Sequence, residues 1–293
     1  MTFREGKHRK QIHLAARCGG QVDFESYVHL ARSAERGLFD FLLLTDVDTL
    51  TMLASLAAVS DRLGLVGTVD TTTDQPFAVA RQLATLDHLS DGRSGWHAAT
   101  TSDTDRYPRA AEFITVARAF WDSWETGAVR ADEETGVYAD PGRIHAVEHR
   151  GTQFDVRGYA TVPAGPQGHP VLLLDGDSAD GQELGAEYAD VLVALDPGQQ
   201  SYADAKARAV AHGRDPQRLK VFQNRHFVGT PAQVAAEMDQ HVQSDVCDGF
   251  ILDPYLVPHG LDEFVDAVVP LLQERGVFRT EYEGATLREH LGL

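Results

Sequence analysis

Polar side chains that could do chemistry follow nearly every short apolar run in this sequence. They are Arg17, Cys18, Asp46, Asp48, the stretch 70–74, His97, Asp175, Asp177, Ser178, Asp196, Asn224, His226 and Asp253. His97 is the most informative of them, because an imidazole can donate a hydrogen bond or exchange a proton near neutral pH. Carboxylates such as Asp46 and Asp175 could instead surround a divalent cation with oxygen ligands. No His-Glu-x-x-His or similar spacing occurs, so we predict no metal site from spacing.

The same residue types also serve structure alone. Asp and Ser are preferred at helix N-caps, so a capping role stays open for Asp48, Asp74, Asp103 and Ser178. A satisfied structural histidine is an equally good interpretation of His97. No Gly-x-Ser-x-Gly elbow is present, which leaves serine hydrolase chemistry without its usual nucleophile.

Short apolar runs alternate with amphipathic stretches along the chain, which is typical of βα units. About eight such pairs can be counted, the number at which a parallel sheet closes and buries both faces. The polar residues would then meet at the carboxyl ends of the strands. We therefore predict a single α/β domain over residues 1–293, a (β/α)8 TIM barrel with shortened loops and one insertion near residues 125–166. Within it we expect helices at 49–63 and 261–274 and a hairpin at 149–156.

Composition excludes several classes of protein. The 293 residues include 26 Lys plus Arg against 44 Asp plus Glu, and the resulting net charge of -18 would repel nucleic acid and anionic membranes. Cys18 and Cys247 cannot form a disulfide framework, which fits a reducing cytoplasm. We find no secretion signal and no apolar run long enough to cross a bilayer.

Several strings together indicate a family. The run 80–96, Ala-Arg-Gln-Leu-Ala-Thr-Leu-Asp-His-Leu-Ser-Asp-Gly-Arg-Ser-Gly-Trp, resembles the bacterial-luciferase-like flavin monooxygenases. Further similar strings stand at 34–40, 106–107, 112–113, 121–125, 149–158, 166–168, 228–231 and 278–288. The branch with the greatest resemblance contains nitrilotriacetate, dibenzothiophene-sulfone and long-chain-alkane monooxygenases.

This resemblance implies an enzyme that holds reduced FMN, supplied by a separate reductase, and uses O2 to oxygenate a small organic substrate. The residues that it places around the cofactor are Asp46, Thr68, Thr71, His97, Tyr107, Gly176 and Ser178. Of these, Asp46 and His97 are the candidates for a catalytic role, and Ser178 matches a phosphate-binding serine. Since many relatives dimerise or act with a second protein, we expect a homodimer or a partner subunit.

Two departures from this branch bear on cofactor binding. Asp175 and Asp177 occupy a loop that is usually uncharged, and a carboxylate at about 4 Å repels a phosphate charge by about 1 kcal/mol in water. The chain also passes from the strand at 219–222 to Val228 without the long helical insertion that covers the mouth in relatives. Loss of that cover would expose the reaction to water unless a partner subunit restores it.

Two alternatives therefore stay open. In one, the barrel has lost flavin and binds a ligand or a protein partner. In the other, Asp46, Asp175, Asp177 and His97 carry out cation-assisted or acid–base chemistry.

Overall fold

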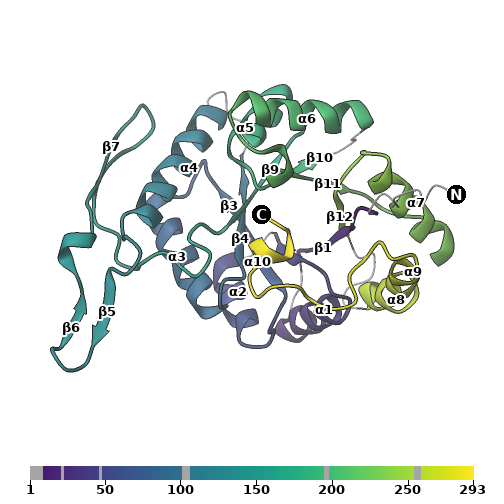
Figure 1. Ribbon diagram of the computed structural model, residues 1–293, viewed down its shortest axis with the longest axis horizontal. Coiled ribbons are helices and arrows are strands. Elements are labelled where there is room, and N and C mark those ends of the chain that lie inside the picture. Colours follow the sequence, from purple (N-terminus) through teal and green to yellow (C-terminus); the bar gives the residue numbers. More distant parts are fainter. Residues whose placement is uncertain (1–8, 21–22, 46–47, 101–105, 195–197, 254–258) are drawn as a thin grey trace, which may run out of the picture.

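The centre of the molecule is a closed barrel of eight parallel strands (Figure 1). The computed structural model describes residues 9–20, 23–45, 48–100, 106–194, 198–253 and 259–293. The barrel strands are β1 (His13–Cys18), β2 (Phe41–Leu44), β3 (Gly64–Asp70), β4 (Ser94–Ala99), β9 (Val171–Asp175), β10 (Val191–Ala194), β11 (Lys220–Asn224) and β12 (Gly249–Leu252). Their order around the barrel is β1-β12-β11-β10-β9-β4-β3-β2. The predicted (β/α)8 barrel is confirmed.

The strands are apolar on both faces, as a closed parallel sheet requires. β2 reads Phe-Leu-Leu-Leu and β9 begins Val-Leu-Leu-Leu, and all eight of these side chains are buried. Inside the barrel, Phe41 stacks on Phe222 with ring centroids 5.7 Å apart. The interior is therefore a packed core and not a channel.

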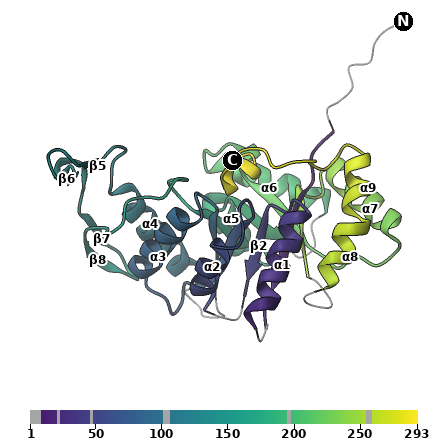
Figure 2. The same ribbon diagram turned by 90° about the horizontal axis from the view of Figure 1, so that it is seen from below.

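Helices follow each barrel strand along the chain, and all of them except α10 belong to the outer layer (Figure 2). They are α1 (Phe24–Arg36), α2 (Thr49–Ala57), α3 (Pro76–Leu89), α4 (Arg106–Asp122), α5 (Ala179–Tyr188), α6 (Gln199–Ala211), α7 (Pro231–Gln243), α8 (Gly260–Ala267), α9 (Val269–Glu274) and α10 (Leu287–His290). Short 3-10 turns occur at Pro141–Arg143 and Pro216–Arg218. Among the described residues, we find no helix with the length and apolar character that a membrane crossing demands.

Two expected helices are shorter than predicted. The helix expected at 49–63 stops at Ala57, because the carboxylate of Glu35 accepts hydrogen bonds from the backbone N–H groups of residues 61–63 and holds them outside the helix. The helix expected at 261–274 is interrupted at Val268. Pro270 lies in the first turn of the second piece, and proline there cannot donate a helical hydrogen bond to the preceding turn.

The chain's last helix, α10, closes the amino-terminal end of the barrel (Figure 1). Leu287 is fully buried and packs against the first residues of β3 and β4. Gly64 permits this close approach, because a Cβ atom there would lie 2.6 Å from a Leu287 methyl group and from the Asp40 carbonyl oxygen.

A buried carboxylate fixes the segment before α10 to the barrel. Asp40 has no exposed surface, and it accepts hydrogen bonds from Arg279, from the Leu14 amide at 2.8 Å and from His13 at 3.1 Å. Burial raises the pKa of Asp40, but the charges of Arg279 and His13 outweigh burial and lower it to about 2.

The predicted insertion is present between α4 and β9 and extends to one side of the barrel (Figure 1). It contains two antiparallel hairpins, β5 (Val129–Asp132) with β6 (Val137–Ala139), and β7 (Val147–Arg150) with β8 (Asp155–Gly158). The second is the expected hairpin at 149–156, whereas sequence patterning did not predict the first.

One carboxylate anchors the second hairpin. Glu112 on α4 accepts hydrogen bonds from the His149 ring and from the backbone amides of Thr152, Gln153 and Phe154. Burial alone would raise the pKa of Glu112, but these hydrogen bonds lower it to about 2.

Candidate functional site

Three adjacent strands bring a histidine, a carboxylate and a hydroxyl together at the carboxyl-terminal rim of the barrel. His97 on β4 is paired in register with Thr68 on β3, and β4 also pairs with β9, which ends at Asp175. His97 Nε2 lies 3.0 Å from Asp175 Oδ2, and Nδ1 lies 3.4 Å from Thr68 Oγ1. Both ring nitrogens are therefore engaged, which fixes the orientation of the imidazole.

The charges around Asp175 keep it ionised. Partial burial raises the pKa of Asp175, but the hydrogen bond from His97 and the positive charges of His97 and Arg17 lower it below its ordinary value. Across the rim, Arg17 Nε and Nη2 contact both oxygens of Asp253 at 2.6 and 2.5 Å. His226 Nε2 lies 3.8 Å from the same carboxylate. Acidic and basic side chains thus lie next to one another along the rim.

A second group of polar atoms gathers at the start of α5. Ser178 is the N-cap of this helix, and its Oγ accepts a hydrogen bond from the Gly181 amide at 3.0 Å. The Tyr107 hydroxyl lies 2.5 Å from the same Oγ. The first amides of a helix have no acceptor in the helix itself, and within the described part of the chain those of Ala179 and Asp180 find none elsewhere.

Arg106 adds a positive charge to this group. Its Nη2 donates to the Tyr107 hydroxyl at 2.9 Å, and its guanidinium carbon lies 4.6 Å from the centre of the Tyr107 ring. Hydroxyls, unpaired helix amides and a guanidinium are donors suited to a phosphate. Asp177 opposes them, since its side chain is exposed beside the first turn of α5.

Two carboxylates have structural roles, one directly before α2 and one in the loop after β3. Asp48 caps α2 through the Thr51 amide, so the capping interpretation is confirmed there, as it is for Ser178. Asp74 does not cap α3, whose N-cap is Gln75, so a capping role for it is wrong. Instead Asp74 accepts a hydrogen bond from the Asp70 amide. Burial and the nearby negative charges of Asp70 and Asp48 raise the pKa of Asp74.

A cleft opens at the carboxyl ends of β11 and β12, between α7 and α8. It has a volume of about 770 Å3, and its walls include His226, Phe227, Leu252, Asp253, Leu261 and Phe264. Only residues 225–230 separate β11 from α7, so this connection is as short as the sequence predicted. The cleft is apolar with a few charged groups, which is typical of a site for a small organic molecule.

The structure brings some of the predicted site residues together and separates others. His97 contacts Thr68, Tyr107 contacts Ser178, and Gly176 lies in the loop that joins the two groups. The Thr71 side chain is buried and donates to the Ala99 carbonyl oxygen at 3.0 Å, so we leave it out of the proposed cofactor set.

Three residues named from the sequence lie outside the part of the chain that the structure describes. They are Asp46, Asp103 and Asp196. Sequence reasoning missed Arg106 as a site residue, although its position directly before Tyr107 was a usable signal.

Comparison with known proteins identifies the family. The model of the luciferase-like monooxygenase family matches residues 5–251. N-acetyl-S-(2-succino)cysteine monooxygenase of Bacillus subtilis (strain 168) is 32% identical, and the match covers 96% of this chain and 92% of that protein. Nitrilotriacetate monooxygenase component A of Aminobacter aminovorans is also 32% identical, over 93% of this chain and 90% of its own length. The crystal structure of a long-chain alkane monooxygenase superposes with a TM-score of 0.90 at 26% identity and covers 97% of this chain and 96% of that one.

The chain belongs to the luciferase-like monooxygenase family. It is an oxidoreductase of the monooxygenase class, and its reaction depends on reduced flavin. The predicted family and function are therefore confirmed. The match to the Bacillus protein runs over 407 positions, more than the 293 residues of this chain, so that relative carries segments that this chain lacks.

Proposed function

We propose that this chain binds reduced FMN with its phosphate at the start of α5 and its ring system toward His97. The observation that carries this proposal is the group of donors formed by Ser178, Tyr107, Arg106 and the first amides of α5. Gly176 keeps the backbone of the connecting loop close to β10, because a Cβ atom there would lie 3.1 Å from Leu192. The residues present therefore fit a phosphate-bearing flavin.

Each residue around the site has a task in oxygenation of a small organic substrate. Reduced FMN, when bound, supplies the two electrons that let one atom of O2 enter the substrate while the other leaves as water. His97 can hold or return a proton at Nε2, and Asp175 stabilises the protonated ring at 3.0 Å. The apolar wall of the cleft, including Phe227 and Leu252, excludes water from one side of the substrate.

We propose that a separate reductase provides the reduced flavin. The relative from Aminobacter aminovorans is called component A, a name that places it in a system of more than one component. In this chain the short connection between β11 and α7 leaves the cleft open, so a delivered cofactor can enter from the carboxyl-terminal rim. The substrate is a small organic molecule whose identity depends on the residues of this cleft.

Flavin titrations of substituted proteins test the phosphate site. Tyr107→Phe and Ser178→Ala should each weaken binding of reduced FMN by about 10-fold to 100-fold, because a hydrogen bond to a charged group contributes about 1.5–3 kcal/mol. Binding of riboflavin, which has no phosphate, should change little. Thr286→Ala is the matched control, since it removes the N-cap of α10 at the other end of the barrel. Equal losses for FMN and riboflavin would place the phosphate elsewhere.

A further inference from the structure

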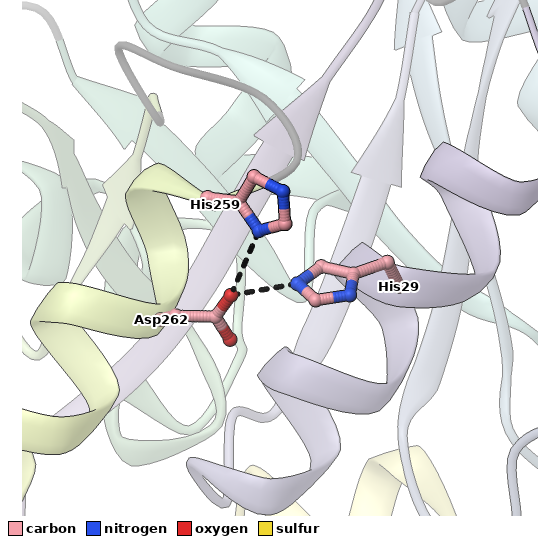
Figure 3. Close-up of side chains that lie close together, drawn as sticks. All are labelled: His29, His259 and Asp262. Atoms are coloured by element: carbon pink, nitrogen blue, oxygen red, sulfur yellow. Dashed lines mark hydrogen bonds and ion pairs between the residues drawn. The ribbon is translucent and has the colours of Figure 1, made fainter.

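Three side chains outside the flavin site converge at the seam between the first and last units of the barrel (Figure 3). His29 comes from α1, and His259 and Asp262 come from the start of α8. His29 Nε2 lies 2.6 Å from Asp262 Oδ2, and His259 Nδ1 lies 3.6 Å from the same oxygen. The three potential ligand atoms all lie within 4.8 Å of one another. Two imidazole nitrogens and one carboxylate oxygen thus face a common point.

The other oxygen of Asp262 is held in place by α1. Oδ1 accepts hydrogen bonds from Ser33 Oγ at 2.6 Å and from Arg36 Nη2 at 3.0 Å, and Ser33 is buried. These contacts turn Oδ2 toward the two histidines. Hydrogen bonds of this kind orient the ligands of metal sites in proteins.

Asp262 also lies among several hydrogen-bond donors. Burial raises the pKa of Asp262, but the hydrogen bonds from Ser33, His29 and Arg36 lower it well below its ordinary range. Arg36 does not cancel the carboxylate charge by itself, because it also pairs with Asp266.

Within the part of the chain that the structure describes, no side-chain hydrogen bond fixes the position of His259. Its Nδ1 is too far from Asp262 Oδ2 for a hydrogen bond at 3.6 Å, yet it points at that oxygen. Its ring also lies edge to face with that of His29, with centroids 4.9 Å apart. A metal ion would account for two rings that point at one carboxylate oxygen, because it accepts a lone pair from each ring and from the oxygen.

We propose that His29, His259 and Asp262 bind a divalent transition-metal ion of the Zn2+ type. Imidazole and carboxylate are ligands that Zn2+ takes at about 2.0–2.2 Å, which puts neighbouring ligand atoms roughly 3.4 Å apart in a tetrahedron. The contact between His259 and Asp262 already has about this length, and His29 would have to retreat by less than about 1 Å.

The site has an open side. The His259 side chain is 78% exposed, and both His259 and Asp262 also border the cleft. With three protein ligands, the fourth position of the ion is free for water or another small ligand. The ion would tie α8 to α1, next to the place where β12 pairs with β1 and closes the barrel.

Calorimetric titration of the chelator-treated protein with ZnCl2 tests this site. We expect one Zn2+ per chain and a rise in the unfolding temperature that depends on Zn2+ concentration. His259→Gln and His29→Gln should each weaken binding at least 10-fold, and Ser33→Ala should weaken it about 10-fold by releasing Asp262. His145→Gln is the matched control, because His145 also lies 2.7 Å from a carboxylate, that of Glu125, and is exposed.

No saturable binding, or binding that His259→Gln leaves unchanged, would overturn the proposal. His259 is the decisive position, since a side chain this exposed can be replaced without loss of the fold. Co2+ provides a second readout, because its visible absorption changes when imidazole ligands enter its coordination. The titration is repeated with FMN present, and the metal site stands or falls independently of flavin binding.

Discussion

Asp177 is the residue whose charge we expect to limit affinity for FMN. Its carboxylate lies beside the first turn of α5, where a Cβ atom at Gly181 would be 3.3 Å from Asp177 Oδ1. Among the described residues, no cationic side chain lies within 4.0 Å of it. Asp175, by contrast, is paired with His97. Asp177→Asn should therefore tighten binding of the phosphate without disturbing the histidine.

The expected gain follows from Coulomb's law. At roughly 6 Å in a water-like medium, two unit charges repel by about 0.7 kcal/mol, and a phosphate carries about 1.5 to 2 charges at neutral pH. Removing this repulsion of about 1 kcal/mol should lower the dissociation constant of FMN by roughly 5-fold to 10-fold. The gain should shrink as salt rises, because exposed charges are screened over about 8 Å at physiological ionic strength.

Anaerobic fluorescence titration with reduced FMN and with reduced riboflavin measures this effect. Riboflavin has no phosphate, so its affinity should be the same for Asp177→Asn as for the natural chain. Glu187→Gln makes the same change of charge about 15 Å along α5, and it should leave FMN affinity within about 2-fold. A gain that is equal for both flavins, or no gain at all for FMN, would refute the placement of the phosphate at α5.

Three further predictions concern stability. Asp40 titrates at about 2 in the folded chain against 3.8 for an ordinary Asp, so the unfolded chain takes up its proton first as pH falls. This difference in pKa should contribute about 2 kcal/mol of stability above pH 5, and the contribution should disappear as pH falls toward 2. Urea unfolding of Asp40→Asn should therefore depend less on acid pH. The same variant should lose about 3–5 kcal/mol of unfolding free energy at pH 7, because Arg279 is left without its buried partner. Glu112→Gln should cost about 1–3 kcal/mol and speed proteolysis between residues 147 and 158, whereas the exposed Glu148→Gln should do neither. Leu287→Ala should cost about 2–5 kcal/mol in thermal unfolding, against almost nothing for Val228→Ala, whose side chain is 89% exposed.

The barrel was predictable because its signal is local and repeated. Apolar runs such as Phe-Leu-Leu-Leu in β2 are buried on both faces, and each is followed by an amphipathic helix. Errors arose where a contact from elsewhere overrides local preference. Glu35, for example, captures three amides after α2 and ends that helix early. The exposed hairpin of β5 and β6 has no alternating buried face, and so it left no pattern in the sequence.

The site was only partly predictable, because contacts between residues far apart in the sequence leave no local pattern. Residues at strand ends must meet at one rim, and this is why His97 and Asp175 could be placed together from their positions in the chain. Spacing could not reveal the cluster of His29 and Asp262, because these residues are 233 positions apart. The roles of the individual residues toward flavin stay predictions.

Helix α10 covers the amino-terminal end of the barrel, and the interior is packed with side chains. Ligands therefore bind at the carboxyl-terminal rim. If reduced flavin and the organic substrate bind at this rim, as we propose, they and the product enter and leave on the same side of the barrel. Steady-state kinetics should then show product inhibition, because a product that dissociates slowly prevents the next reduced flavin from binding. At a high concentration of reduced flavin, product release and not the oxidation step would limit the turnover rate.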